Sequence, residues 1–178
     1  MAKVHCQPSG VPLISVWLYE GGEFKFAPQR DWIGDFGKTG DATDGVFGKG
    51  TDNVPVPAAG TGYYIVVVDL ENETIEVNPA TVYGIGDAFG SYDVKKPEYL
   101  FTVDNDNKVI KFTDVPAAGD LRMYAAASTL ACDWWQAEFI VLSGVIEFRG
   151  TGNDQDRVAL TAGQDVSLNF KDLTGTIE

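Results

Sequence analysis

The stretch YYIVVVDLENETIEV, residues 63–77, contains an apolar run, a short polar turn and a second run rich in β-branched residues. Such residues favour strands, so we expect strands at residues 63–70 and 74–77, joined by a hairpin turn at ENE. The final residues, VSLNFKDLTGTIE at 166–178, follow the same plan. One strand–turn–strand unit therefore occurs twice in the chain.

The repeat extends outward from these hairpins. GEFKF at residues 22–26 aligns with GDLRM at 119–123, and Asp31-Trp32 aligns with Asp133-Trp134. Each half then reads as a strand with an acidic and a basic residue, an Asp-Trp loop, an extended segment, an Ala-Gly pair and the hairpin. We interpret the chain as two copies of one β-module, residues 1–79 and 80–178, because a proline after a polar residue ends a strand at Asn78-Pro79.

Many further short strands, separated by Gly, Asn, Asp and Pro, indicate an all-β protein. We expect two tandem immunoglobulin-like β-sandwich modules. The second copy opens with VYGIGDAFGSYD at 82–93, whereas the first has only 21 residues before Gly22. The first module is therefore expected to be incomplete at its N-terminal edge, and an open edge favours a dimer by sheet-edge pairing. AAASTLACDWW, residues 125–135, is the one candidate helix and is equally readable as a loop.

Composition limits the function. Of 178 residues, 44% are hydrophobic and 22% charged, as in globular proteins with a real core. The net charge of −13 argues against a nucleic-acid partner and an anionic membrane surface, which both require clustered Lys and Arg. An acidic surface suits a protein with a neutral ligand, and it equally suits plain solubility.

The cysteines, the histidine and the N-terminal residues say little about metal binding, disulfides or export. A single histidine and no Cys/His cluster exclude a standard zinc site. The two cysteines, Cys6 and Cys132, are expected to be independent thiols, although a disulfide is possible. No run approaches the roughly 20 apolar residues of a membrane helix, and MAKVHCQPSG lacks the apolar region of a signal peptide. We therefore expect either a cytoplasmic protein or part of a longer exported one.

Three segments carry a family resemblance. GIGDAFGSYD at 84–93 resembles the GDAT…GWD opening of modules in the SusE/SusF group of Bacteroidetes outer-membrane glycan-binding proteins, with Tyr92 in place of the family's Trp. GEFKF followed by DWIGDFG, and DNVPVPAAGTGYYIVVVDL at 52–70, are similar to later parts of the same module. The resemblance implies non-enzymatic β-sandwich modules that bind a starch-like α-glucan at the cell surface, in a glycan-uptake complex.

Sugar binding predicts particular side chains. An aromatic ring covers the apolar face of a sugar, while charged or amide groups bind its hydroxyls. In EFKF, strand alternation places Phe24 and Phe26 on one face and Lys25 on the other, where a ligand could meet it. The predicted ligand-binding residues are Lys25, Trp32 and Asn53 in the first module, and Tyr92, Arg122, Tyr124, Trp134 and Trp135 in the second.

Each of these residues also has an ordinary structural interpretation. Large aromatics commonly fill the interior of a sandwich, so we expect Trp17 in the core. Trp32 is as readily core as exposed. Extended geometry would expose one of Trp134 and Trp135. Lys25 and Arg122 would ordinarily be solvated surface, and only their repeated placement favours a binding role.

Other function classes receive less support. The carboxylates mostly occupy turns, whereas a glycosidase needs two that face one cleft, so we expect no enzyme and no catalytic residues. DNDN at 104–107 and NDQD at 153–156 offer oxygen ligands for a structural calcium ion, but such turns are common without metal. The alternative function is a structural or adhesive module that mediates protein–protein contacts on a bacterial surface.

Overall fold

The computed structural model describes residues 4–6, 11–27, 30–43, 45–128, 130, 132–150 and 152–178. These residues form β-strands and three short 3₁₀ helices: η1 (Asp87–Phe89), η2 (Pro97–Tyr99) and η3 (Trp134–Ala137). The prediction of an all-β protein is confirmed. No helix within these ranges is long and apolar enough to cross a membrane.

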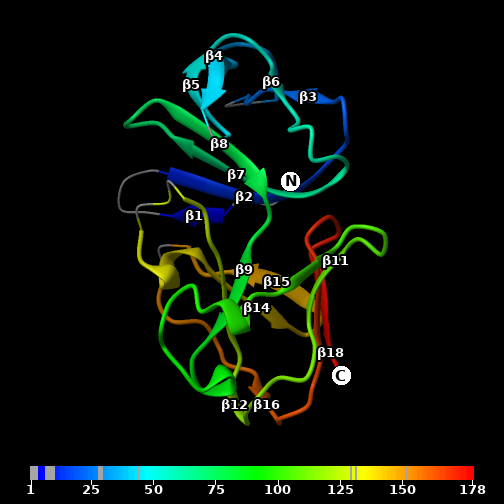
Figure 1. Ribbon diagram of the computed structural model, residues 1–178. Helices are drawn as coiled ribbons and strands as arrows, with labels where there is room; N and C mark the ends of the chain where they lie inside the picture. Colours follow the sequence, from blue (N-terminus) through cyan, green and yellow to red (C-terminus); the bar gives the residue numbers. More distant parts are fainter. Residues whose placement is uncertain are drawn as a thin grey trace.

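The first sheet occupies the upper half of Figure 1 and is antiparallel throughout. The hairpin predicted at residues 63–77 forms its centre. In spatial order its strands are β1 (Val4–Cys6), β2 (Val11–Leu18), β7 (Gly62–Asp69), β8 (Thr74–Pro79), β5 (Val46–Gly50) and β4 (Gly37–Thr43). A small pair, β3 (Glu23–Phe24) with β6 (Val54–Pro55), lies beside it.

The second sheet occupies the lower half of Figure 1. In spatial order its strands are β10 (Thr102–Asp104), β11 (Val109–Phe112), β17 (Val166–Asn169), β18 (Thr174–Ile177), β15 (Val145–Phe148), β14 (Glu138–Leu142), β13 (Arg122–Ala125) and β9 (Val82–Ile85). A small pair, β12 (Gly119–Asp120) with β16 (Ala159–Leu160), accompanies it.

The two sheets share part of their strand order. The order β2-β7-β8-β5-β4 corresponds to β11-β17-β18-β15-β14, and the pair β3–β6 corresponds to β12–β16. The second sheet continues through β13 to β9, the strand that opens its half of the chain. Among the described residues, the first sheet has no counterpart of β9, as expected from the short segment before Gly22.

Strand β7 is buried on both faces, which explains why its apolar run does not alternate with polar residues. Its even-numbered residues pack in a first core with residues of β8, among them Ile75 and Val77. The odd-numbered Tyr63, Ile65 and Val67 pack instead in a second core with the second sheet. A single strand therefore contributes to both cores.

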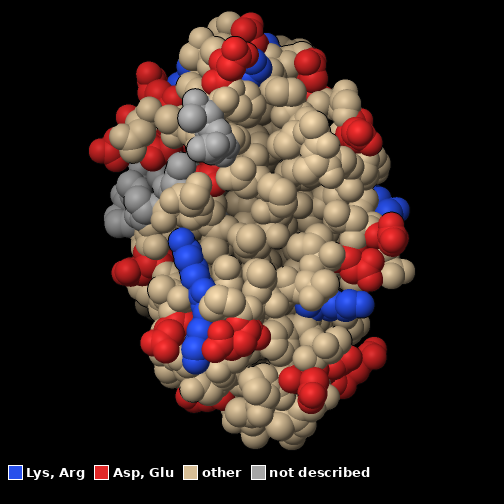
Figure 2. Space-filling model, in the orientation of Figure 1, with Lys and Arg blue, Asp and Glu red and all other residues tan. Residues whose placement is uncertain are grey.

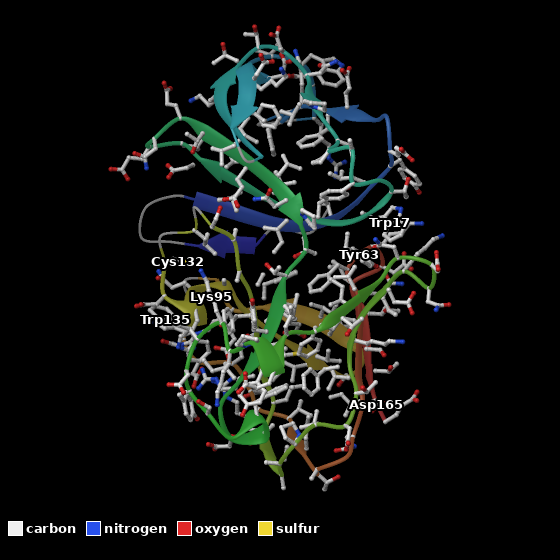
Figure 3. The ribbon with its side chains drawn as sticks, in the orientation of Figure 1. Trp17, Tyr63, Lys95, Cys132, Trp135 and Asp165 are labelled. Carbon is white, nitrogen blue, oxygen red and sulfur yellow. The ribbon has the colours of Figure 1, made fainter. Side chains whose placement is uncertain are left out.

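Polar contacts at Tyr63 join the two halves of the molecule. The Tyr63 hydroxyl lies 2.7 Å from the carbonyl oxygen of Lys108 and 3.0 Å from Oδ1 of Asn169. Its backbone N–H donates to Asn105 Oδ1 at 3.2 Å. Trp17 packs edge-on against the Tyr63 ring, at 4.9 Å between centroids (Figure 3). The predicted core position of Trp17 is confirmed in part, since its side chain is only half-buried at this junction.

Three local predictions require correction. Strands β4 and β5 were missed because each contains two glycines, which are poor strand formers, although backbone pairing recruits both segments. Of the two alternatives for residues 125–135, the helix is wrong: among the described residues of this stretch, only Trp134 and Trp135 lie in a helix, the 3₁₀ helix η3. Cys132 is disulfide-bonded and not an independent thiol. Strand β1, which contains Cys6, lies beside η3.

Candidate functional site

The two aligned basic strands hold matching ion pairs. Lys25 Nζ lies 3.1 Å from Asp35 Oδ2, and Arg122 Nε lies 2.8 Å from Glu138 Oε1. The residues that follow them also correspond, since Phe26 pairs with Phe36 and Met123 pairs with Phe139. The predicted alternation is confirmed, because Phe24 and Phe26 pack against the first core while Lys25 forms its ion pair.

Glu138 is the centre of a larger network in the second sheet. Its carboxylate is fully buried and accepts from three guanidinium groups: Arg122 at 2.8 and 2.9 Å, Arg149 at 2.8 Å and Arg157 at 2.9 Å. The same three arginines contact the more exposed Asp154. Removing a carboxylate from water costs free energy, and pairing its charge with cations in this way offsets that cost.

The network controls the ionisation of Glu138. Burial is the largest single influence and raises the pKa of Glu138, but hydrogen bonds from Arg122 and Arg149 and the nearby positive charges outweigh it. The pKa of Glu138 is therefore lower than its ordinary value. Arg157, followed by the other two arginines, likewise lowers the pKa of Asp154. Both carboxylates are ionised at neutral pH.

Two of these arginines lie over tryptophan rings. The Arg122 guanidinium is 4.7 Å from the Trp134 ring centroid, and that of Arg149 is 4.9 Å from the Trp135 centroid. Such cation–π stacking fixes both partners. The turn that presents the indoles is rigid, because Asp133 and Gln136 form a reciprocal capping box around η3. Both tryptophans are half-buried.

Tyr92 and Tyr124 complete the surroundings of Arg122. Tyr92 is 56% exposed, and a Cβ built on Gly86 would lie 3.4 Å from Arg122 Cδ and 3.5 Å from Tyr92 Cζ, so both side chains approach Gly86. Tyr124 is only 2% exposed and packs 6.0 Å from Trp134, so it forms the floor beneath the indole. The structure therefore brings all five residues predicted in the second half to one region.

The predicted residues of the first half are more dispersed. Trp32 is 75% exposed beside Ile33, in the loop between the paired residues Phe26 and Phe36. Lys25 is held near the base of this loop by Asp35. Asn53 donates to Glu23 Oε2 at 2.9 Å on the β3–β6 pair.

The two acidic turns considered for calcium also make contacts within the chain. Asp104 accepts hydrogen bonds from the backbone and side chain of Asn107, which closes the β10–β11 hairpin as predicted. Asp154, in the second turn, belongs to the arginine network. Within the part of the chain that the structure describes, no group of three His, Cys, Asp or Glu residues is arranged to hold a metal ion.

Sequence reasoning missed Asp35, Glu138, Arg149 and Arg157. Glu138 had a visible signal, because a carboxylate at the start of the apolar run EFIVL must find cationic partners if it is buried. Arg149 and Arg157 both lie in the irregular segment after β15, and no local spacing links them to Glu138 on β14.

The uncharged surface is unevenly distributed. On the face shown in Figure 2, acidic side chains lie mostly toward the rim, and a broad uncharged area crosses the middle. Basic side chains are few on this face.

Comparisons with known proteins agree with one another. The sequence model of a family described as SusF/SusE starch specific CBMs matches residues 81–176. Outer membrane protein SusF of Bacteroides thetaiotaomicron is 32% identical over 165 residues, which cover 88% of this chain and 34% of that protein. The crystal structure of SusF from the same organism matches with a TM-score of 0.80 at 28% identity, covering 99% of this chain and 42% of the other. The chain thus spans less than half the length of SusF.

Proposed function

The chain belongs to the SusF/SusE family of starch-specific carbohydrate-binding modules, as its motifs predicted, and we propose that it binds a starch-like α-glucan without catalysis at a bacterial cell surface. The family is one of binding modules, which agrees with the expectation that the protein is not an enzyme. The observation that carries the proposal is the stacking of Arg122 over Trp134, with the exposed ring of Tyr92 near the same strand position at Gly86.

This arrangement supplies both kinds of contact that a glucose unit needs. The accessible parts of Tyr92 and Trp134 cover its apolar C–H face, and guanidinium N–H groups of Arg122 donate to its hydroxyls. Trp135 lies beside them over Arg149. Because Glu138 and Trp134 already fix Arg122, little side-chain entropy is lost when the sugar binds.

We propose Trp32, Lys25 and Asn53 as a weaker second site, with residues 1–79 and 80–178 acting as two modules. A single site of this size is expected to bind with a Kd on the order of micromolar to millimolar. Two sites on one chain increase the apparent affinity for a polymer, because the second contact is intramolecular.

Location and partners complete the proposal. The protein acts at the outer membrane, on the outer surface, within a glycan-uptake complex, and pairs through a sheet edge to form a dimer. Strands β1, β4, β9 and β10 are the edge strands of the two sheets. Sedimentation over a concentration series tests the dimer. Concentration-dependent self-association without a response to glycan would favour the adhesive alternative.

Electrophoresis in native gels with and without soluble starch tests the binding function. The wild-type chain is expected to be retarded by starch, Trp134→Ala to lose most of the retardation, and Trp32→Ala part of it. Tyr19→Ala is the matched control, because Tyr19 is also exposed but belongs to neither site. Equal migration of the wild-type chain in both gels would refute the proposed function.

A further inference from the structure

Two cavities adjoin at Lys95, and one of them reaches Trp134. One, of about 180 Å³, is lined by Tyr124, Trp134 and the segment 125–127, together with Lys95. The other, of about 230 Å³, extends from Lys95 to the junction of the two sheets. Lys95, Ala126 and Ala127 line both, so the two cavities form one groove. We call it the junction groove.

Aromatic rings line the floor of the junction groove. Tyr83 stacks on Tyr124 with 5.8 Å between ring centroids, and Tyr124 packs against Trp134 at 6.0 Å. These rings belong to a small apolar cluster with Ile85 and Ala126, separate from the two main cores. Tyr83 and Trp134, whose rings are half-buried, lie at the two ends of this row of three aromatic rings. Aromatic surface therefore continues from the Arg122 site toward the first sheet.

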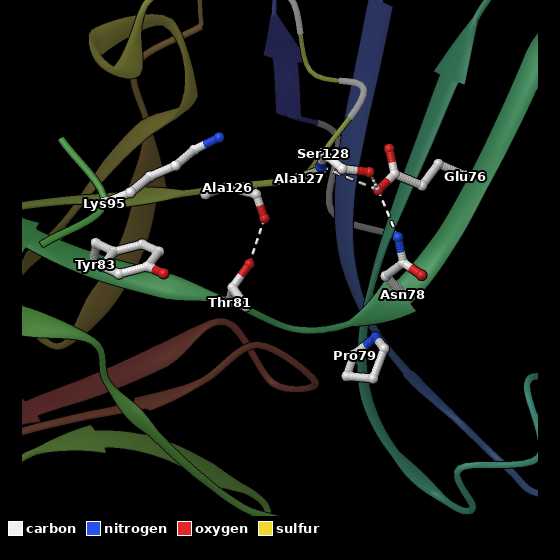
Figure 4. A pocket seen from close by; sticks show the side chains of 9 residues that line it. All are labelled: Glu76, Asn78, Pro79, Thr81, Tyr83, Lys95, Ala126, Ala127 and Ser128. Atoms are coloured by element: carbon white, nitrogen blue, oxygen red, sulfur yellow. Dashed lines mark hydrogen bonds between the residues drawn. The ribbon is translucent and has the colours of Figure 1, made fainter. Parts of the chain in front are cut away.

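Polar groups from both sheets line the far end. Figure 4 shows Lys95 and Tyr83 on one side of the cavity, and Glu76, Asn78 and Ser128 on the other. The buried Glu76 carboxylate accepts from Asn78 Nδ2 at 2.5 Å and from the Ser128 hydroxyl at 2.9 Å, which fixes both side chains. Glu76 and Asn78 come from β8, so this end of the groove exists only because the two sheets are joined.

Lys95 is the distinctive residue of the groove. Its backbone has a φ of 55°, and its N–H donates to the Tyr124 hydroxyl at 2.5 Å, which anchors the loop against the aromatic floor. Within the described ranges its ammonium forms no ion pair or hydrogen bond, and in Figure 4 it extends along the groove toward Ala127 and Ser128. An exposed ammonium above aromatic rings can donate to hydroxyl groups of a bound ligand.

We infer that the junction groove is a further binding subsite, which receives additional units of a glucan chain held at Trp134, with Lys95 as its donor. This inference rests on the proposed function. The ligand class follows from the lining, because aromatic floor, one cation and a buried carboxylate together suit a neutral polyhydroxylated chain. A strongly anionic ligand would be repelled by the Glu76 carboxylate.

The subsite predicts a specific dependence on oligosaccharide length, measured by calorimetry with maltotriose and maltoheptaose. All variants carry Trp32→Ala, so that the first-half site contributes nothing. The Trp32→Ala parent should bind maltoheptaose several-fold more tightly than maltotriose. Lys95→Met should weaken maltoheptaose binding about threefold to tenfold and leave maltotriose unchanged. Ala127→Phe, which fills the groove, should abolish the preference for the longer chain.

Lys171→Met is the matched control, because it removes the same charge from the β17–β18 turn and should change neither affinity. Thermal unfolding of each variant confirms that it is folded. If Lys95→Met and Ala127→Phe bind both oligosaccharides as the parent does, or lose both equally, the groove is not a subsite. If the wild-type chain binds neither oligosaccharide nor starch, the proposed function itself fails.

Discussion

Arg122 and Glu138 form a two-bond ion pair, in which Nε and Nη2 donate to separate carboxylate oxygens at 2.8 and 2.9 Å. The pair lies directly behind the Trp134 ring, over which the guanidinium is stacked. Lys25 and Asp35 repeat the pair in the first half with a single contact and greater exposure. The second-half site is therefore the more rigidly organised of the two.

Glu138→Gln should weaken both folding and binding. A neutral amide cannot balance three guanidinium groups, and breaking a buried ion pair of this kind typically costs about 3–5 kcal/mol. Urea unfolding measures the loss of stability, and starch-gel retardation measures the loss of binding. Glu147→Gln is the control, since Glu147 is exposed on neighbouring β15. Equal stability of the two variants would contradict the role of Glu138.

Acidification should reduce the difference between wild type and Glu138→Gln. The folded-state pKa of Glu138 lies below its unfolded value, which is about 4.3. Its contribution to stability is therefore complete above about pH 5 and declines as the pH falls through 4 toward the depressed folded pKa. Urea midpoints of both proteins from pH 7 to pH 3 test this. A difference that stays constant down to pH 3 would exclude the linkage.

Trp32→Ala should change polymer binding without changing stability. The Trp32 side chain is 75% exposed, and truncation of such a surface residue usually alters stability by less than about 0.5 kcal/mol. Retardation by starch should fall, while maltotriose binding at the second site should stay the same. A large drop in melting temperature would show instead that Trp32 supports its loop.

Tyr63→Phe should destabilise both halves together. The hydroxyl bridges β7 to Lys108 and Asn169, and the loss of these partly buried contacts typically costs about 0.5–1.5 kcal/mol. Because β7 serves both cores, we expect one shifted unfolding transition, with maltotriose affinity unchanged in the folded state. Unfolding at the junction of the two halves is followed by the fluorescence of Trp17, in a chain whose other tryptophans are replaced. Two separate transitions would show that the halves unfold independently.

Cys132→Ser should lower the melting temperature under oxidising conditions. Removing a native disulfide commonly costs about 2–5 kcal/mol. Cys132 lines the junction groove, so the preference for longer oligosaccharides should also weaken. Under reducing conditions the wild-type chain should melt close to the variant. Identical melting of the two proteins in oxidising buffer would exclude a stabilising role.

Local patterns predicted much of the fold. The hairpins at residues 63–77 and 166–178 form as expected, because apolar runs and turn residues act over a few positions. The repeat placed Lys25 and Arg122 in equivalent positions. Strands β4 and β5 were missed, since each contains two glycines and β5 is held by backbone pairing with β8, which is distant in sequence.

Residues of the candidate site could be predicted only where the sequence repeat or the family motif marks them. Arg122, Trp134 and Tyr92 were found through alignment of the two halves and the family motif. Glu138, Arg149 and Arg157 were not, because their contacts join residues up to 19 positions apart through sheet geometry. Tyr124 was expected to contact ligand but lies on the floor, since burial depends on which neighbouring side chains cover a strand.

The burial of β7 on both faces has a mechanical consequence. Rotation of one half relative to the other would pull Tyr63, Ile65 and Val67 of β7 out of the second core. We therefore expect the aromatic surfaces near Trp32 and Trp134 to keep a fixed spacing and orientation. A polymer that touches both must match that interval through its own curvature or branching.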